Sequence, residues 1–502
     1  MSQHQQKIDD LKSKSFTGKL KFLANDAIVY GIAGALSKFL AIFLVPILTR
    51  IITKEAFGLV DAITVFNGVF CVISIFGMDS AVARFFYDTE DDLERKKIVS
   101  LGFYSQIIQA GIISITVYLL AKPLSEFYLD STEYVNLIEI GAGIIFSMVF
   151  LQYFQLLLKW TFQRNKFLII ALGNILVNFS LTFVFVFFFE WGVEGVFYAR
   201  LFSNLLFALL GLIYCRSFIV ANISIDKHLK KMLAYGIPIM TIVLIPTFIP
   251  GLERYFILNE LSGTYLGEYA VGIRLASLIA LAAVAFNNVW RPFSLALHKE
   301  ENAEETYNKM AIIYVLIMSF IGLVIVGMAK PIVMILAPEN FHEAVYLVLP
   351  LTFAGIILNV CKTFNQLGIS LSKKTYLSLI SYLIHLVISA SLIYYFVQDF
   401  ELFGVVYAVL ISNLILITVI TFFSYRAYSI RYDLLRMSLL FVIAFGIGYI
   451  QSKTYNFELL LQIPINLGLC IAYLMIVYRI IIKKSERSLI KEKFGSKIPF
   501  LS

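Results

Sequence analysis

Three basic residues lie inside apolar stretches that are long enough to cross a membrane. Lys38 is eleven residues beyond Ala27, where its stretch begins, and Arg200 and Arg274 lie about eight residues inside theirs. At 1.5 Å per residue, Lys38 reaches about 16 Å into a bilayer core of about 30 Å. Inserting a cation at that depth costs roughly 2.5 to 3.5 kcal/mol of free energy, so we expect Lys38 to line an anion-binding cavity. The alternatives are that its side chain snorkels to the membrane surface or pairs with Glu139.

Acidic residues in the same stretches offer the opposite chemistry, binding of a cation. Asp61, Asp79, Glu139 and Glu268 are the carboxylates concerned, and Asp79 is near enough to Arg84 to pair with it. His385 lies about 13 Å into its stretch. It is either a packing residue or a group that takes up a proton during coupling. The groups that we take as coupling sites or charge partners are Asp61, Asp79, Glu139, Arg200 and His385. Coupling would use Na+ or H+, and neither a cofactor nor a metal site is expected, because the four cysteines lie far apart.

Fourteen apolar stretches of about 20 residues position these groups. The first lies near 27–50, and the eleventh and twelfth lie near 376–397 and 401–425. The 502 residues are 60% hydrophobic and 15% charged, with a mean hydropathy of +0.84, whereas about a quarter of a soluble chain is charged. These values exclude a soluble enzyme and a disordered or collagen-like chain. They predict an all-α polytopic membrane protein with about 14 transmembrane helices.

The basic residues also predict the orientation in the membrane. Of the 41 Lys and Arg, 32 fall in segments on the side of the N-terminus and six on the other side. Cytoplasmic segments collect Lys and Arg, so both termini are expected in the cytoplasm. The net charge of +8 then reflects topology, and a nucleic-acid partner is not expected.

An internal repeat organises the chain. GVFYARLFSNLL at 195–206 recurs as GVVYAVLISNLI at 404–415, an offset of 209 with eight of twelve positions identical. Each repeat holds six spans, an even number, so the two six-helix bundles should be parallel and related by an axis along the membrane normal, as in transporters. The predicted parts are a cytoplasmic segment 1–26, bundles 27–217 and 233–426 joined by a cytoplasmic linker 218–232, an additional helix pair 427–482, and a basic cytoplasmic tail 483–502.

Prolines and arginines recur at equivalent positions of the two halves. The segment from Pro46 to Arg50 matches Pro250 to Arg254 at an offset of 204, and Pro246 lies in the same span as Pro250. A proline removes a helix hydrogen bond, so these prolines predict either hinges or static kinks. Arginines at span ends commonly anchor helices, but their equivalence across the repeat favours a shared role.

Three segments carry a family resemblance. They are YGIAGALSKFLAIFLVPILTRIITKEAFGLVDA at 30–62, GMDSAVARFFYD at 77–88 and GVEGVFYARLFSNL at 192–205. In these segments, and over the twelve paired spans, the chain resembles the polysaccharide and oligosaccharide flippases, including O-antigen flippases, of the multidrug, oligosaccharidyl-lipid and polysaccharide exporter superfamily. In that family the first two spans of each bundle line a central cavity. The resemblance therefore implies substrate-binding cations at Lys38, Arg50, Arg84, Arg254, Arg274 and Arg291.

The resemblance implies transport rather than catalysis. The expected substrate is an undecaprenyl-diphosphate-linked oligosaccharide. It would be moved by alternating access from the cytoplasmic to the outer leaflet of a bacterial inner membrane, for surface polysaccharide such as the O-antigen of lipopolysaccharide. Alternatives are a cation-coupled drug or metabolite antiporter and a non-transporting membrane scaffold for glycan assembly. Expected partners are membrane lipid, a polysaccharide polymerase and glycosyltransferases. No enzyme is expected, because the sequence holds no P-loop, HExxH motif or nucleophile elbow in a fitting context.

Overall fold

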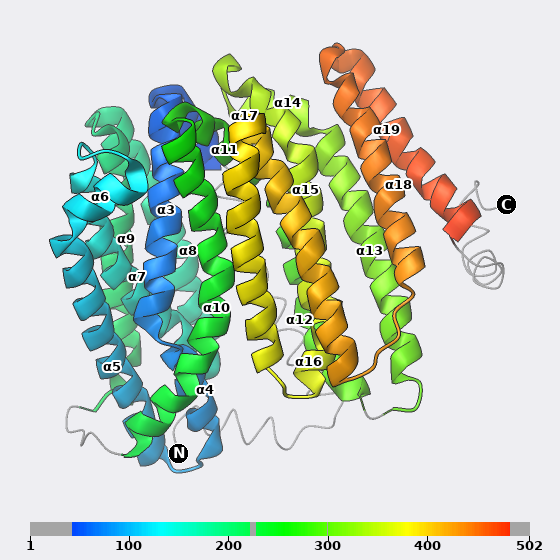
Figure 1. The fold of residues 1–502 in the computed structure, drawn as a ribbon. Helices are drawn as coiled ribbons and strands as arrows, with labels where there is room; N and C mark the ends of the chain where they lie inside the picture. Colours follow the sequence, from blue (N-terminus) through cyan, green and yellow to red (C-terminus); the bar gives the residue numbers. More distant parts are fainter. Residues whose placement is uncertain (1–42, 221–226, 299, 482–502) are drawn as a thin grey trace. The chain divides into compact units, whose positions relative to one another are not determined.

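A computed structural model describes residues 43–220, 227–298 and 300–481, and the regular elements of these residues are all helices (Figure 1). Residues 43–51 are helical. The next elements are α3 (Lys54–Ile75), α4 (Met78–Asp88), α5 (Asp92–Leu119), α6 (Ala121–Leu129), α7 (Val135–Trp160), α8 (Arg164–Phe183), π-helix η1 (Val184–Phe188), α9 (Gly192–Cys215), 3-10 helix η2 (Arg216–Phe218) and α10 (Lys227–Glu260). Lys38 lies outside the described residues.

The later elements follow in the same manner. They are α11 (Gly263–Ala276), α12 (Ile279–Leu297), α13 (Ala303–Gly327), α14 (Ala329–Leu336), 3-10 helix η3 (Glu339–Ala344), α15 (Val345–Val360), π-helix η4 (Cys361–Asn365), α16 (Leu367–Leu371), α17 (Tyr376–Ala427), α18 (Leu434–Lys453), 3-10 helix η5 (Thr454–Asn456), α19 (Leu459–Ile476) and π-helix η6 (Val477–Ile481).

Twelve helical stretches of the described residues are long and apolar enough to cross a membrane. The predicted all-α membrane fold is therefore confirmed. α17 is 52 residues long and is interrupted at Glu401, which has a φ of 49°, so the predicted spans 376–397 and 401–425 lie on either side of this break. The predicted first span, 27–50, lies largely outside the described residues, and the count of fourteen stays a prediction.

The backbone repeats a special conformation in the two halves. Gly192 has a φ of 53° and Glu401 a φ of 49°, and their numbers differ by the repeat offset of 209. Glycine adopts this left-handed conformation without strain, whereas a glutamate does so only where the surroundings hold it. Three residues later, a Cβ on Gly404 would lie 2.0 Å from the carbonyl oxygen of Phe396, so the chain turns back on itself here.

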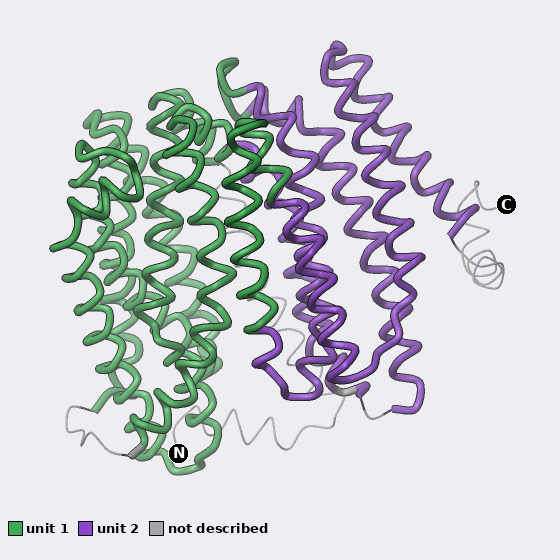
Figure 2. The backbone as a smooth tube through the Cα atoms, in the orientation of Figure 1, with its two compact units in different colours: residues 1–270, 336–341, 379–408 green, residues 271–335, 342–378, 409–502 purple. Residues whose placement is uncertain are grey.

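The chain divides into two compact units (Figure 2). Unit 1 comprises residues up to 270 with 336–341 and 379–408, and unit 2 comprises 271–335, 342–378 and the chain from 409 on. In unit 1, α3 packs against α7 and α10, and α7 packs against α5 and α9. In unit 2, α13 packs against α15, α18 and α19. α10 is thus grouped with the helices of the first half, and the predicted bundle boundaries stay a prediction.

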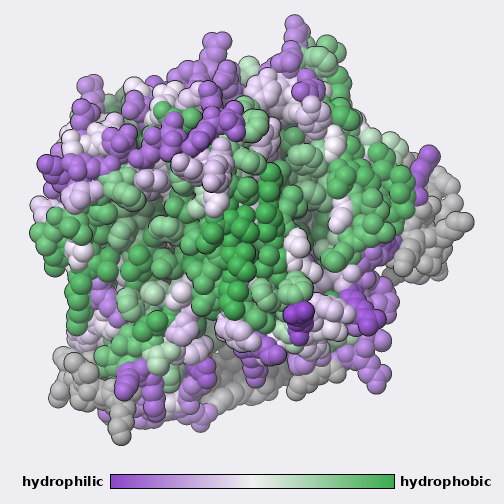
Figure 3. Space-filling model, in the orientation of Figure 1, coloured by the Kyte–Doolittle hydropathy of each residue, from purple (hydrophilic) through white to green (hydrophobic). Residues whose placement is uncertain are grey.

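The surface fits a bilayer. On the face that Figure 3 shows, hydrophobic side chains form a broad band, and hydrophilic side chains gather toward the ends of the helices. Many large apolar side chains on the helices are exposed, among them Ile108, Ile112 and Ile115 of α5. In water such a surface would be unfavourable, whereas lipid tails accept it.

Glycines let α3 and α11 approach closely within unit 1. A Cβ on Gly267 would lie 2.2 Å from the carbonyl oxygen of Lys54, and a Cβ on Gly58 would lie 2.8 Å from that of Gly263. We expect Gly267→Ala to destabilise the protein by about 1–3 kcal/mol, because the backbone must move apart. Thermal unfolding in detergent measures this. Gly68→Ala in α3, where nothing lies within 4 Å of the added carbon, is the matched control, and equal behaviour of the two variants would contradict the prediction.

Candidate functional site

A buried arginine joins α10 to α3. Arg254 is only 4% exposed, and Asp61 is 7% exposed. The Nε and Nη2 atoms of Arg254 each lie 3.0 Å from Oδ2 of Asp61. The Nη1 atom of Arg254 donates to Oε2 of Glu253 at 2.8 Å. One guanidinium therefore holds two carboxylates, and these charge-assisted bonds are of the strong kind.

An aromatic residue of α11 completes this group. The hydroxyl of Tyr269 donates to Oε2 of Glu253 at 2.7 Å, and the Arg254 guanidinium lies 5.0 Å from the centre of the Tyr269 ring. We call Asp61, Glu253, Arg254 and Tyr269 the charge cluster. With all three ionisable side chains charged, it carries one net negative charge. Ionisable residues buried in membrane spans commonly mark a transport pathway.

Local sequence places the charge cluster near the end of unit 1 at which α3 begins. Thr53 caps α3, its Oγ1 accepting from the Ala56 amide at 3.2 Å, and Asp61 follows the first helical residue by seven positions, or about 10 Å. Arg254 precedes the end of α10 by six positions. Nearby on α6, outside the apolar spans, burial raises the pKa of Tyr128 well above its ordinary value, so this phenol stays neutral.

The predicted equivalence of two proline-arginine segments has a structural counterpart. Nη1 of Arg50 donates to the Pro46 carbonyl at 2.9 Å, and Nη1 of Arg254 donates to the Pro250 carbonyl at 3.3 Å. In both halves the guanidinium therefore donates to the carbonyl of the proline four residues earlier in the chain. Burial differs, because Arg50 is exposed. α10 continues as one helix through Pro246 and Pro250, and the role of these prolines as hinges stays a prediction.

Arg84 has a different partner from the one expected. Its Nε lies 3.8 Å from Oδ2 of Asp88, one turn further along α4, and its guanidinium lies over the ring of Tyr235 at 4.6 Å. Asp79 instead accepts from the amide of Ser80 at 2.7 Å. Pairing of Arg84 with Asp79 is therefore wrong: Asp79 lies in the first turn of α4, where it accepts from the backbone.

The remaining predicted groups are dispersed over other helices. Arg200 on α9 donates to Oγ1 of Thr64 at 3.0 Å, and Glu139 on α7 is half-buried. The other three are the half-buried Arg274 on α11, the exposed Arg291 on α12 and the buried His385 on α17. Of the predicted residues, the structure brings Arg254 and Asp61 together. Their roles in binding or coupling stay predictions.

Sequence reasoning missed three residues of this region. Glu253 and Tyr269 belong to the charge cluster, and Lys54 pairs with Glu268 between α3 and α11. The side chains of this pair are 13% and 12% exposed. A signal for Glu253 was present, since two adjacent ionisable residues near the end of an apolar stretch predict a buried pair. Lys54 offered no such signal, because it follows a predicted span end.

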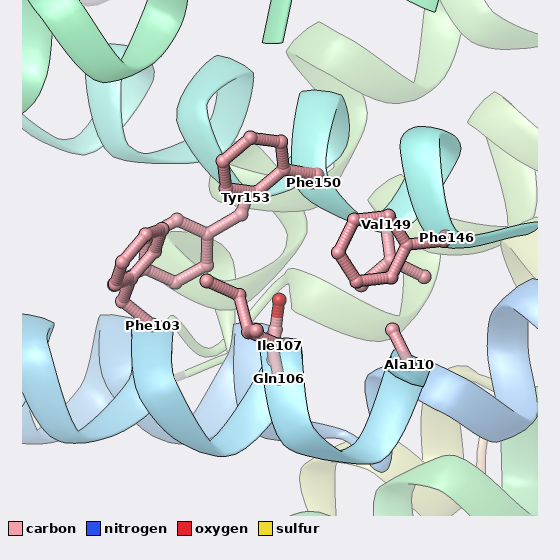
Figure 4. Close-up of a pocket in the computed structure, with 8 residues that line it drawn as sticks. All are labelled: Phe103, Gln106, Ile107, Ala110, Phe146, Val149, Phe150 and Tyr153. Carbon is pink, nitrogen blue, oxygen red and sulfur yellow. The ribbon is translucent and has the colours of Figure 1, made fainter. Parts of the chain in front are cut away.

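Two cavities of unit 1 do not suit an anionic headgroup. Figure 4 shows the first, between α5 and α7, where aromatic rings surround Gln106. Its volume of about 10 Å³ is that of one water molecule. Gln106 is 3% exposed, and within the described part of the chain its Nε2 meets no acceptor. The second cavity, of about 320 Å³, is lined by Glu55, Glu133 and Glu194 beside Trp191, and its negative charge would repel a phosphate.

Comparison with known proteins agrees with this architecture. The family model for polysaccharide biosynthesis proteins matches residues 47–346. An uncharacterized membrane protein of Haemophilus influenzae is 24% identical over 275 residues, which cover 54% of this chain and 65% of that relative. The match thus spans slightly less than two thirds of the relative.

Solved structures show the same fold at low identity. The lipid II flippase MurJ in an inward closed conformation has a TM-score of 0.66 at 16% identity, covering 90% of this chain and 99% of MurJ. A multidrug resistance MATE transporter in an inward-facing conformation has a TM-score of 0.57 at 16% identity, covering 81% and 98%. The chain belongs to the polysaccharide biosynthesis protein family and has the helical fold of the MurJ and MATE transporters.

Proposed function

We propose that this chain is a flippase that moves an undecaprenyl-diphosphate-linked oligosaccharide from the cytoplasmic to the outer leaflet of a bacterial inner membrane. The charge cluster is the observation that carries the proposal, because buried ionisable side chains between two spans are expensive and commonly mark a transport pathway. Family membership supports a polysaccharide role, and the likeness to MurJ supports a lipid-linked substrate.

The charge cluster has the composition of a coupling site rather than of a phosphate clamp. When both are ionised, Asp61 and Glu253 together carry two negative charges, and Arg254 offsets one of them. A proton or Na+ would balance the other, and its binding would change the attraction between α3 and α10. These helices come from different repeat halves, so ion binding at the charge cluster would bias the two halves toward or away from each other.

The distribution of basic residues supports an orientation with both termini in the cytoplasm. The beginning of α3 and the end of α10 then lie at the outer side, and the charge cluster lies about 10 Å inside it. A cation from outside would reach the charge cluster over a short path. Glycosyltransferases and a polymerase would act before and after this step.

A cation-coupled antiporter of drugs or metabolites is the second candidate. The acidic cavity of about 320 Å³, with Glu55, Glu133 and Glu194 beside Trp191, favours it, because carboxylates and an aromatic face suit an organic cation. Glu55 and Glu194 also lie in the first turns of α3 and α9, where the helix dipole stabilises acids. That structural explanation weakens the case for an antiporter.

Reconstitution of the purified chain tests the proposal. Vesicles would hold a fluorescent undecaprenyl-diphosphate-linked oligosaccharide in both leaflets, and an impermeant quencher added outside would report exchange between leaflets. We expect quenching to go beyond the outer half only in vesicles that contain the protein. Cation-driven dye efflux without glycolipid movement would decide for the antiporter. Movement of neither, with glycan assembly that depends on the cytoplasmic loops, would decide for a scaffold.

A further inference from the structure

A second arginine contacts α3 one helical turn from the charge cluster. Arg200 on α9 is half-buried, and its Nη1 donates to Oγ1 of Thr64 at 3.0 Å. Thr64 follows Asp61 by three positions on α3, and residues so spaced lie on one face of a helix with their Cβ atoms roughly 5–6 Å apart. α9 packs directly against α3. Changes of side-chain rotamer are therefore enough to bring the Arg200 guanidinium onto the Asp61 carboxylate.

The positive charge of Arg200 equals the charge that would neutralise the charge cluster. When its three ionisable side chains are charged, the charge cluster carries one net negative charge, because Arg254 offsets one of two carboxylates. Arg200 brings the sum to zero. The partner of Arg200 on α3 is a neutral hydroxyl, which an uncharged amide side chain could bond as well, whereas a cation inside a span is expensive. The bond to Thr64 therefore does not explain why this residue is an arginine.

The contact between α3 and α11 gives the register in which these two helices repeat. A Cβ on Gly58 would clash with the carbonyl oxygen of Gly263, and a Cβ on Gly267 would clash with that of Lys54. Gly267 follows Gly58 by 209 positions, and Gly263 follows Lys54 by the same 209. The two close contacts thus exchange places under the repeat offset of 209, so this offset relates α3 to α11 as it relates α9 to its counterpart.

The second half of the chain forms the same helices without the polar groups of the first. The residues that lie 209 positions after Asp61, Thr64 and Arg200 are all apolar, and they are Ala270, Ile273 and Val409. A carboxylate, a hydroxyl and a guanidinium are thus present together in one half and absent together from the matching positions of the other. Packing of the helices does not require them, which favours a shared role for the three.

Parting of the repeat halves would take Arg254 away from Asp61. α3 and α9 belong to the first half and α10 belongs to the second, so alternating access of the halves separates this ion pair. A buried carboxylate that loses its only cation is strongly unfavourable. Arg200 belongs to the same half as Asp61 and would stay beside it during this movement.

We propose that Arg200 is a positioning residue that binds the Asp61 carboxylate when Arg254 is withdrawn. In the present structure Asp61 holds Arg254, and Arg200 holds Thr64. In the parted state Arg200 holds Asp61, and the Thr64 hydroxyl bonds a carbonyl of its own helix. This exchange of partners lowers the free energy of the parted state, so that both states are populated. The proposal rests on the proposed function for the movement of the halves, whereas the exchange itself is a property of the folded chain.

A mutant cycle on unfolding of the full chain tests the exchange without transport. The starting variant is Glu253→Gln, Arg254→Met, which leaves Asp61 as the one carboxylate of the charge cluster and removes its partner. Arg200→Gln is introduced into the wild type and into the starting variant, and unfolding is followed in mixed micelles. We expect Arg200→Gln to lower the denaturant midpoint more in the starting variant than in the wild type, because Asp61 there depends on Arg200 alone.

Three controls show whether the additional shift belongs to the charges of Asp61 and Arg200. In Asp61→Asn, Glu253→Gln, Arg254→Met the charge cluster holds no carboxylate, and Arg200→Gln should shift the midpoint as little as in the wild type. Arg200→Lys keeps the positive charge, so it should remove most of the additional shift. Lys309→Gln, which replaces an exposed lysine of α13, should shift the midpoint equally in every background.

Equal shifts by Arg200→Gln in the wild type and in the starting variant would overturn the proposal. A starting variant that does not fold would also overturn it, since Arg200 then fails to hold Asp61. In reconstituted vesicles we expect Arg200→Gln to move glycolipid about tenfold or more slowly, because an unpartnered carboxylate makes the parted state costly, and Arg200→Lys to stay near the wild type.

The two measurements also separate this proposal from the proposed function. Transport at the full rate by Arg200→Gln would show that the movement does not use the exchange, and it would overturn the role of Arg200 while leaving the flippase intact. A wild type that moves no glycolipid, together with the expected additional shift in the mutant cycle, would overturn the proposed function and leave the exchange of partners standing.

Discussion

Replacing Arg254 with methionine is expected to lower the free energy of unfolding by about 3–5 kcal/mol, because removing one partner leaves buried charges uncompensated. Asp61 and Glu253 would then face each other with only the Tyr269 hydroxyl as a described donor to Glu253. Equilibrium unfolding in mixed micelles measures the change. The variant is also expected to lose transport, since its folded fraction falls.

Two further variants separate the effect of uncompensated buried charges from the effect of losing an arginine side chain. Arg84→Met removes an arginine whose side chain is 56% exposed, and it should cost about 1 kcal/mol or less. The triple variant Asp61→Asn, Glu253→Gln, Arg254→Met leaves no charge in the charge cluster, so it should recover most of the stability lost by Arg254→Met. We expect the triple variant to be folded but unable to couple transport to an ion. If Arg254→Met is as stable as Arg84→Met, the charge cluster does not contribute the expected amount to the free energy of unfolding.

The helices were predictable from the sequence, whereas the pairing of their polar residues was not. Apolar stretches of about 20 residues sufficed for an all-α membrane fold, and the family resemblance is confirmed. The sequence indicates Asp61 as a carboxylate inside an apolar stretch, and Arg254 as an arginine at a span end that recurs in both halves. Their contact joins residues 193 positions apart, and one sequence holds no signal that one carboxylate rather than another meets a given arginine.

Backbone details account for the groups that sequence reasoning missed. The sequence places Lys54 between spans, but it opens α3. Its side chain is only 13% exposed, because Gly58 and Gly267 bring α11 against it. A close glycine contact changes which residues are buried without changing the hydropathy.

The sequence repeat and the compact units divide the chain differently, and they predict opposite behaviour of the contact between Lys54 and Glu268. The sequence repeat assigns α3 to the first half and α11 to the second, so alternating access of the repeat halves must separate them. The compact units instead place Lys54 and Glu268 together in unit 1, and movement of these units as rigid bodies would leave the contact intact. The ion pair between Lys54 and Glu268 therefore reports which bodies move.

Cross-linking this contact should stop transport almost completely. Lys54→Cys and Glu268→Cys would be joined by a short thiol reagent that a reductant cleaves; the four native cysteines are buried and hence poorly reactive. We expect glycolipid movement to fall to background on cross-linking and to return on reduction, because the repeat halves can no longer part.

The matched control is Lys309→Cys with Glu305→Cys, which also replaces a lysine-glutamate pair but lies one turn apart within α13. Its cross-link joins two residues of the same helix and should leave transport unchanged. Transport at the full rate by cross-linked Lys54→Cys, Glu268→Cys would mean that α3 and α11 stay together throughout the cycle. The charge cluster would then lie inside one moving body, and an ion bound there would act on the stability of that body rather than on the distance between two.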